Sequence, residues 1–337
     1  MLTMLRELCA LDGVSGSEGA VRAYICNALQ ASPYVESIDV DALGNVLAFL
    51  PGRSKAASKL MIAAHMDEVG VIATGVTEDG FVRFATVGGI DKAVLFGHRV
   101  RFGETVGVIG GKAIHMCKGD EKDFVPDGDL LIDIGVSSKE EALSKVTYGD
   151  TAVFDSDFYE IGRLVKGRAI DDRAGCAVLL NLARSRPACD LWLAFTVQEE
   201  VGLRGAKTAA FAIDPDIGIV IDATTAADTV GVSEDKQVCK VGGGAVVSFM
   251  DRRTLYDKPL YDEIMMLSVE RGIAAQPKSM VAGGNDAGSI QSAAHGARVA
   301  AISLPCRYIH SPSCMASMED LQAVYDLVSA LTERYGV

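Results

Sequence analysis

Four apolar segments of this 337-residue chain lead into side chains that bind metal ions or transfer protons. The segment 191–197 leads into Glu199 and Glu200, 60–64 into His65, 217–221 into Asp222, and 299–304 is followed by His310. Strands that are apolar at nearly every position are buried on both faces, as in the parallel sheet of an α/β domain. Such sheets bind ligands just beyond the carboxyl ends of their strands, so we expect these side chains to meet at one edge.

The residue types fit a pair of divalent cations. Two zinc or cobalt ions need a bridging carboxylate, and each also needs one histidine and one terminal carboxylate. The five candidate ligands are His65, Asp171, Glu200, Asp222 and His310. Glu199 then remains free as a general base. Asp67 lies two residues after His65, on the same side of an extended chain, and is expected to hold the imidazole by a hydrogen bond.

Each candidate also has an ordinary structural interpretation. A Glu-Glu pair is often a solvated helix start, and Asp171 precedes the apolar helix expected at 176–183, where an aspartate can serve as an N-cap. A single histidine is more often structural than a ligand. His98, His115 and His295 lie in polar or glycine-rich segments without neighbouring carboxylates, and we expect them at the surface or in a supporting position.

Alternation of strand and helix patterns predicts an α/β domain on both sides of an insert. Helices are expected at 2–11, from Ser15 onward, and at 205–211, 261–271 and 318–335, with strands at 35–40, 45–50, 60–65, 191–197, 217–221 and 246–249. Between about 70 and 160, closely spaced glycine turns indicate short strands of a small β-barrel or sandwich, with one helix at 137–146. We expect this insert to be an oligomer interface rather than a lid.

Composition narrows the classes of partner. The formal net charge is −13 and there is no block of Lys and Arg, so binding to nucleic acid or to an anionic membrane surface is not expected. No apolar run reaches the roughly 20 residues of a membrane span. The eight cysteines show no Cys-x-x-Cys spacing and fit reduced core residues. These features predict a cytoplasmic protein.

Five ordered motifs resemble those of the tetrahedral (TET-type) aminopeptidases, the glutamyl-aminopeptidase family of dinuclear metallopeptidases, some of whose members were once labelled endoglucanases. They are Ala64-His65-Met66-Asp67-Glu68-Val69-Gly70, Ala169-Ile170-Asp171-Asp172-Arg173, Gln198-Glu199-Glu200-Val201-Gly202, Ile221-Asp222-Ala223 and Arg307-Tyr308-Ile309-His310-Ser311-Pro312. The resemblance covers essentially the whole chain. It implies a zinc-peptidase-like fold, with a mixed, largely parallel sheet flanked by helices over 1–69 and 161–337, and a β-rich dimerisation domain over 70–160.

The resemblance also implies a role for each candidate. Asp171 would bridge two metal ions, His65 and Asp222 would complete one site, and Glu200 and His310 the other. Glu199 would be the general base and Asp67 would orient His65. The implied enzyme is a metallo-aminopeptidase that hydrolyses the N-terminal bond of peptides with a free amino terminus, and its dimers would assemble into a tetrahedral dodecamer.

Other functions remain open on the sequence. A related dinuclear amidohydrolase, either an N-acyl amino acid deacylase or a carboxypeptidase, could use the same ligands. A non-catalytic oligomer would be expected to lack a ligand or the base, and none is missing. A glycosidase would need paired carboxylates without metal, which the two candidate histidines do not favour. The pocket for the side chain of the substrate's first residue is expected in segments 223–260 and 280–295. The sequence does not indicate which first residue this pocket prefers.

Overall fold

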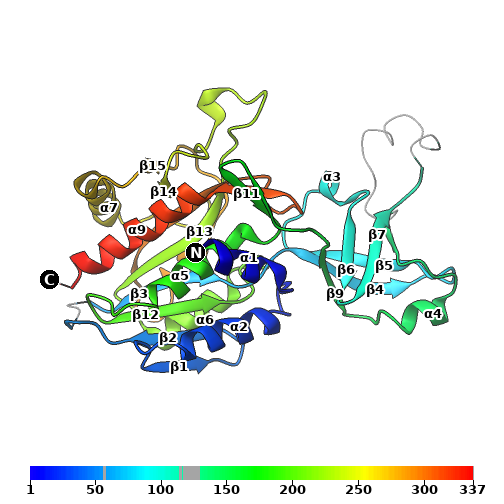
Figure 1. Ribbon diagram of the computed structural model, residues 1–337, viewed down its shortest axis with the longest axis horizontal. Coiled ribbons are helices and arrows are strands. Elements are labelled where there is room, and N and C mark those ends of the chain that lie inside the picture. The colour runs from blue at the N-terminus through cyan, green and yellow to red at the C-terminus, as the bar shows by residue number, and fades with distance from the viewer. Residues whose placement is uncertain (56–57, 114–115, 117–129, 337) are drawn as a thin grey trace.

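The computed structural model describes residues 1–55, 58–113, 116 and 130–336. It has two parts that lie side by side, a helix-covered sheet and a smaller β-barrel (Figure 1). The α/β fold class, with its mixed sheet and an inserted barrel, is confirmed.

The large sheet has a parallel centre and antiparallel edges. Its main path is β1-β2-β12-β3-β13-β16-β17-β11-β10, and β12, β3, β13 and β16 run parallel to one another. The strands of this path are β1 (Ser37–Val40), β2 (Val46–Leu50), β12 (Leu191–Thr196), β3 (Leu60–His65), β13 (Ile217–Thr225), β16 (Arg298–Arg307), β17 (Cys314–Ser317), β11 (Leu164–Gly167) and β10 (Tyr159–Ile161). β14 (Ala245–Val247) pairs with β16 and β15 (Ala275–Pro277) with β14. The central strands are almost wholly buried, as their continuous apolar runs predict.

Helices cover both faces of the sheet. One core contains residues of α1 (Leu2–Ala10), α2 (Gly19–Gln30), α5 (Ile170–Leu182), α7 (Lys258–Arg271) and α9 (Met318–Arg334). The core on the opposite face contains residues of α6 (Arg204–Ile213) and α8 (Ala287–Ile290). Within β3, Leu60 and Ile62 belong to the first core and Met61 and Ala63 to the second. This alternation follows the two-residue period of a strand, so β3 is apolar throughout because both its faces are covered.

The barrel is a closed antiparallel ring in the order β4-β5-β8-β7-β6-β9. Its strands are β4 (Gly70–Val76), β5 (Val82–Val87), β6 (Arg99–Phe102), β7 (Thr105–Gly110), β8 (Leu131–Asp133) and β9 (Thr151–Phe154), and it also carries α3 (Lys92–Leu95) and α4 (Lys139–Leu143). The interior is a separate apolar core that includes Ile109 and Ile132. The helix expected at 137–146 is α4, whose N-cap Ser138 accepts the Glu141 N–H.

Two element boundaries differ from expectation. The predicted insert ends at 160, within β10, but β10 pairs with β11 of the large sheet and the last barrel strand ends at Phe154. β13 continues to Thr225 because β16 pairs with it over all nine residues. Asp222 therefore lies within a strand rather than just after one.

Among the described residues, no helix combines the length and the apolar character needed to cross a membrane. The seven described cysteines all carry free thiols, and six of them are buried. Cys117 lies outside the described residues.

Candidate metal centre and adjoining pocket

The parallel centre of the sheet brings the candidate ligands together. His65 is the last residue of β3, Glu199 and Glu200 follow β12, Asp222 lies near the end of β13, and His310 follows β16. Asp171 comes from the start of α5, where its backbone is not yet helical. Since the four strands run in the same direction, their carboxyl ends share one edge of the sheet, as predicted.

Asp171 lies between the two histidines. Its Oδ1 is 3.1 Å from His65 Nε2, and its Oδ2 is 3.4 Å from His310 Nε2. On the far side, His65 Nε2 is 3.7 Å from Asp222 Oδ1, and His310 Nε2 is 3.2 Å from Glu200 Oε1. The result is two donor groups that share one carboxylate.

The donor atoms within each of these groups, His65–Asp171–Asp222 and Asp171–Glu200–His310, lie within 4.8 Å of one another. A third set, His65–Glu199–Glu200, meets the same criterion. Glu199 is therefore next to the donors but belongs to neither of the groups that share Asp171. This is the position that a general base beside a metal centre requires.

The orientation of both imidazoles fits metal ions. His65 Nδ1 is 3.1 Å from the backbone oxygen of Asp67, and His310 Nδ1 is 2.7 Å from the backbone oxygen of Gly89. A carbonyl oxygen can only accept a hydrogen bond, so each Nδ1 carries a proton. Each Nε2 can then offer its lone pair to a cation. Imidazole nitrogen and carboxylate oxygen are donors that zinc and other first-row divalent metals accept.

The charges of the site also fit a cation. Burial, together with repulsion from Asp171, raises the pKa of Asp222 to about 7. Burial likewise raises the pKa of Glu199 well above its ordinary value, with Asp222, Asp286 and Glu200 adding to the effect. Carboxylates this close and this buried repel one another when ionised. Bound cations would relieve that repulsion.

The same carboxylates act on the imidazoles. Burial disfavours a charged His65, but hydrogen bonds to Asp171, Asp222 and Asp67 outweigh it and raise its pKa. In the same way Asp171 and Glu200 raise the pKa of His310 to about 11. Because these carboxylates favour protonated imidazoles, binding of a metal ion to either histidine must displace a proton.

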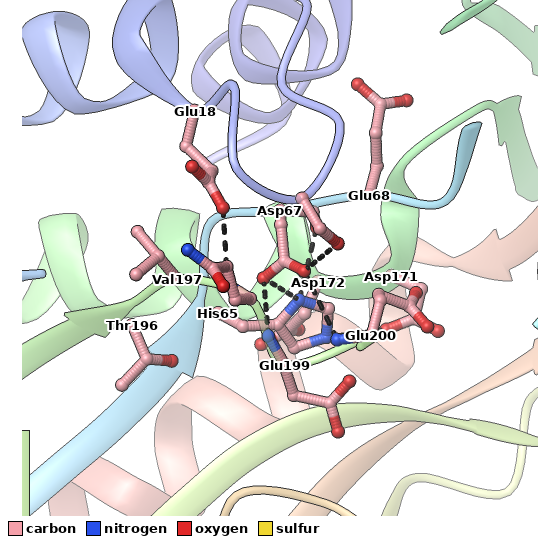
Figure 2. Close-up of polar contacts among 12 residues, drawn as sticks. Glu18, His65, Asp67, Glu68, Asp171, Asp172, Thr196, Val197, Glu199 and Glu200 are labelled. Carbon is pink, nitrogen blue, oxygen red and sulfur yellow. Dashed lines mark hydrogen bonds and ion pairs between the residues drawn. The ribbon is translucent and has the colours of Figure 1, made fainter. Parts of the chain in front are cut away.

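Asp67 makes more contacts than the sequence predicted. Its carboxylate Oδ1 is 3.5 Å from His65 Nδ1, while its backbone oxygen is the nearer acceptor. The carboxylate also accepts the N–H groups of Glu199 at 3.0 Å and Glu200 at 3.2 Å, and the Ser15 hydroxyl at 2.5 Å. Figure 2 shows Asp67 between His65 and the backbone of the glutamate pair. Nothing in the sequence spacing indicates these contacts, because they depend on the pairing of β3 with β12.

The barrel also reaches the metal centre. Gly89, whose oxygen accepts from His310, belongs to the segment between β5 and α3. Its neighbour Gly88 has a φ of +83°, and a Cβ there would meet the Val69 side chain at 2.7 Å and Glu200 Cβ at 3.3 Å. The close approach therefore requires glycine.

A cavity of about 160 Å³ adjoins the metal centre. Thr224, Thr225 and Val238, and the stretch from Ala282 to Asn285, come from the two segments expected to form a pocket. Lys278, Ser303 and Ile309 also line it but lie outside those segments. Sequence reasoning missed Lys278 because only the pairing of β15 with β14 brings it here.

The remaining histidines lie apart from these donor groups. His98 is exposed and packs edge-on against Phe154, with ring centroids 6.1 Å apart. His295 is exposed and its Nδ1 is 3.0 Å from Asp214 Oδ2. His115 lies outside the described residues. Neither His98 nor His295 belongs to a group of possible metal donors among the residues that the structure describes.

A helix-covered sheet with nitrogen and oxygen donor groups at its carboxyl edge is the arrangement expected of an α/β enzyme that uses divalent metals for hydrolysis. The chain belongs to the M42 glutamyl aminopeptidase family, whose model matches residues 44–327. It is a metal-dependent aminopeptidase, as the sequence motifs predict.

Relatives of similar length support this membership. A putative aminopeptidase of Acetivibrio thermocellus is 40% identical over 98% of this chain and 98% of its own length. The lysyl aminopeptidase of Pyrococcus furiosus is 30% identical, covering 98% of this chain and 96% of its own. A solved structure of the Pyrococcus horikoshii TET1 peptidase, described as able to form a tetrahedron or a large octahedral shell, superposes with a TM-score of 0.85 at 32% identity and covers 98% of both chains.

Proposed function

We propose that the chain is an aminopeptidase whose subunit holds two divalent ions, zinc or cobalt, bridged by Asp171. His65 and Asp222 would hold one ion, and Glu200 and His310 the other. The observation that carries this proposal is that the two histidines face opposite oxygens of Asp171, at 3.1 and 3.4 Å. A carboxylate with a separate donor group on each oxygen is suited to bridging two ions.

When bound, such ions supply Lewis-acid activation of a water molecule and of the scissile carbonyl. Glu199 takes the proton of the attacking water and then delivers it to the leaving amine. Its raised pKa suits this exchange, because a carboxyl that is buried among other carboxylates holds a proton more readily than a solvated one. Asp67 keeps Glu199 in place through the backbone N–H.

The preference for a free amino terminus would come from the site itself. Four carboxylates line the cavity beside the metal centre: Asp171, Glu199, Glu200 and Asp222. A protonated amine is attracted to such a group, whereas a blocked amino terminus has no charge to offer. Exopeptidase action then needs no separate recognition domain.

The test is hydrolysis of aminoacyl-p-nitroanilides by purified protein that has been stripped of metal and then reloaded with zinc or cobalt. N-acetylated forms of the same substrates serve as matched controls. We expect metal-dependent release from free-amine substrates alone. Release from the acetylated substrates would instead indicate a deacylase or a related amidohydrolase, and release independent of metal would exclude the proposed centre.

We further propose that the barrel mediates homo-oligomerisation, by dimers that assemble into a dodecamer. On β7, Val106 and Val108 are exposed while Gly107 and Ile109 between and beyond them are buried, so an apolar strip points outward. The Pyrococcus horikoshii TET1 peptidase is described as able to assemble into a tetrahedron or a large octahedral shell. The double variant Val106→Glu/Val108→Glu should give smaller particles by light scattering, and an unchanged mass would exclude this strip as an interface.

A cytoplasmic location is a further proposal. It is supported by the free thiols of the seven described cysteines, which suit a reducing compartment. Fractionation of the source cells, with detection of the protein by antibody, would test it, and recovery outside the cytoplasmic fraction would contradict it.

A further inference from the structure

A buried carboxylate from the N-terminal segment reaches the backbone beside the metal centre without belonging to either donor group that shares Asp171. This residue is Glu18, which lies immediately before α2 and is only 3% exposed. Its Oε1 accepts the Gly16 N–H at 2.7 Å and the Gln198 N–H at 3.2 Å. Figure 2 shows the Glu18 side chain pointing to the backbone beside Val197. The second contact joins residues 180 positions apart, directly before the proposed base.

Two buried carboxylates hold three successive N–H groups of the segment that carries this base. Glu18 accepts from Gln198, and Asp67 accepts from Glu199 at 3.0 Å and from Glu200 at 3.2 Å. Hydrogen bonds from backbone N–H groups to carboxylates are among the stronger ones in proteins. Glu18 therefore extends, by one residue toward β12, the support that Asp67 gives to the glutamate pair.

The backbone changes direction at Gln198. Its φ is +56°, in the left-handed region that residues with a Cβ seldom adopt. Such a conformation persists only where the surrounding structure holds it. The Gln198 side chain is not what holds it inside, because its Oε1 accepts from Arg204 at the surface, at 3.3 Å. The bond from the Gln198 N–H to Glu18 is thus made at the residue whose conformation sets where the Glu199 side chain leaves the backbone.

The segment that carries Glu18 is itself docked on the end of β3. Val14 forms a parallel bridge with Glu68. The Ser15 N–H donates to the Glu68 oxygen at 3.3 Å, and the Glu68 N–H donates to the Gly13 oxygen at 2.9 Å. On its other side the segment continues into α2, which buries one apolar face against the sheet core. Glu18 is therefore fixed from both directions along the chain.

The contribution of Glu18 is an acceptor oxygen rather than a charge. Burial raises the pKa of its carboxyl, and the nearby Asp67 carboxylate raises it too, while the hydrogen bonds from Gly16 and Gln198 lower it. The folded protein thus disfavours the ionised form of Glu18. Both N–H groups bond to the same oxygen, Oε1. An uncharged side chain with one well-placed oxygen can make the same contacts.

We infer that Glu18 is a positioning residue for the hydrolysis: it holds Gln198 in the left-handed conformation and thereby directs Glu199 toward the metal centre. This inference rests on the proposed function, because it takes Glu199 as the general base. A displacement of about 1 Å in a reacting group can lower a rate by about 100-fold. A residue that touches neither substrate nor metal can therefore control turnover.

The experiment compares variants of the metal-loaded protein on the aminoacyl-p-nitroanilide that the wild type cleaves fastest. Glu18→Met removes the acceptor at similar side-chain length, and kcat should fall by about 10- to 100-fold while KM and metal content are kept. Glu18→Gln retains an acceptor oxygen for both N–H groups and should keep most of the wild-type kcat. Glu36→Met is the matched control, because Glu36 is an exposed glutamate shortly after α2.

A double-mutant cycle tests whether Glu18 acts through Glu199. Once Glu199→Gln has removed the proposed base, no base remains to be directed, so adding Glu18→Met should change kcat little. A residue that merely supports the fold would lower kcat by the same factor in both backgrounds. The comparison therefore separates a positioning role from a general loss of stability.

The outcomes separate this inference from the proposed function. If the wild type cleaves no free-amine substrate, the proposed function fails, and full activity in Glu199→Gln would exclude the base. If the wild type is active and Glu199→Gln is not, three results would contradict the role of Glu18 alone. These are an unchanged kcat in Glu18→Met, a fall in kcat that follows loss of metal, and equal factors in the two backgrounds.

Two further variants keep the test decisive if Glu18→Met fails to fold. Glu18→Ala then takes its place, since a smaller side chain leaves the turn at Gly16 room to relax. If neither folds, Glu18→Gln decides. A large loss of kcat in that variant would show that the charge of Glu18 matters rather than its acceptor oxygen, and would overturn the inference.

Discussion

The carboxylate of Asp67 accepts the backbone N–H of Glu199 at 3.0 Å. The contact crosses from the end of β3 to the end of β12, two parallel neighbours in which His65 is paired with Thr196. The same buried carboxylate accepts from Glu200 and lies near the His65 imidazole. One side chain therefore connects His65, a proposed metal ligand, to the proposed base Glu199 and to a second proposed ligand, Glu200.

Asp67→Asn tests this connection. The amide keeps the shape but can offer an N–H where the carboxylate accepts one, so the glutamate backbone should shift. We expect kcat to fall by about 10- to 100-fold, the usual cost of changing a group that orients metal ligands. Asp39→Asn, an exposed aspartate on β1, is the control. Loss of thermal stability without any change in kcat or metal content would limit Asp67 to a structural role.

Glu199→Gln and Glu200→Gln should have different effects although the residues are adjacent. The first removes the proposed base, so metal content should persist while kcat falls by about 10²- to 10⁴-fold. The second weakens a proposed ligand, so about one ion per subunit should be lost. Elemental analysis beside steady-state kinetics distinguishes them. Full activity in Glu199→Gln would remove Glu199 from the mechanism.

Gly88→Ala tests the contact between the barrel and the metal centre. The new Cβ would press against Val69 and Glu200, at 2.7 and 3.3 Å, and displace a proposed ligand. Gly103→Ala is the matched control, because Gly103 also has a positive φ but has open space at its Cβ. Both should lose about 1 kcal/mol of stability from backbone strain, but only Gly88→Ala should lower metal affinity and kcat. Equal kinetics in the two variants would exclude the coupling.

Asp286 predicts a pH dependence of stability in the metal-free protein. Burial raises its pKa from 3.8 to about 6, against a hydrogen bond from the Thr196 hydroxyl. As the pH rises from about 4 to about 6, the unfolded chain releases this proton while the folded chain still holds it. The free energy of unfolding therefore falls through this window, by up to about 3 kcal/mol for this group.

Asp286→Asn should remove this group's contribution to the fall in the free energy of unfolding. The variant should therefore be as stable as the wild type near pH 4 and more stable at pH 7. Urea unfolding in the presence of a chelator, at intervals between those values, measures the difference. Asp39→Asn controls for the loss of an exposed charge. Parallel curves for Asp286→Asn and the wild type would contradict the assignment.

The sequence predicted the elements of the fold well because their signals are local. The continuous apolar run at 60–65 gave the bounds of β3, and helical periodicity placed α1, α7 and α9 to within a few residues. From the spacing of turns, the sequence predicted a small barrel or sandwich but did not decide between them. Closure of the barrel depends on the pairing of β4 with β9, across about 80 residues. The extension of β13 through Asp222 likewise depends on its partner β16.

By itself, the sequence determined which chemical groups follow which strands, and therefore that histidines and carboxylates suited to divalent metals would meet at one sheet edge. Only the tertiary structure decided which oxygen of Asp171 faces which histidine, that Asp67 holds the glutamate backbone, that Gly89 accepts from His310, and that Lys278 enters the cavity wall. The physical reason is the separation along the chain of the residues that interact. A strand or a turn is set by neighbouring residues, whereas these contacts join segments far apart in the chain and follow from strand register and side-chain packing.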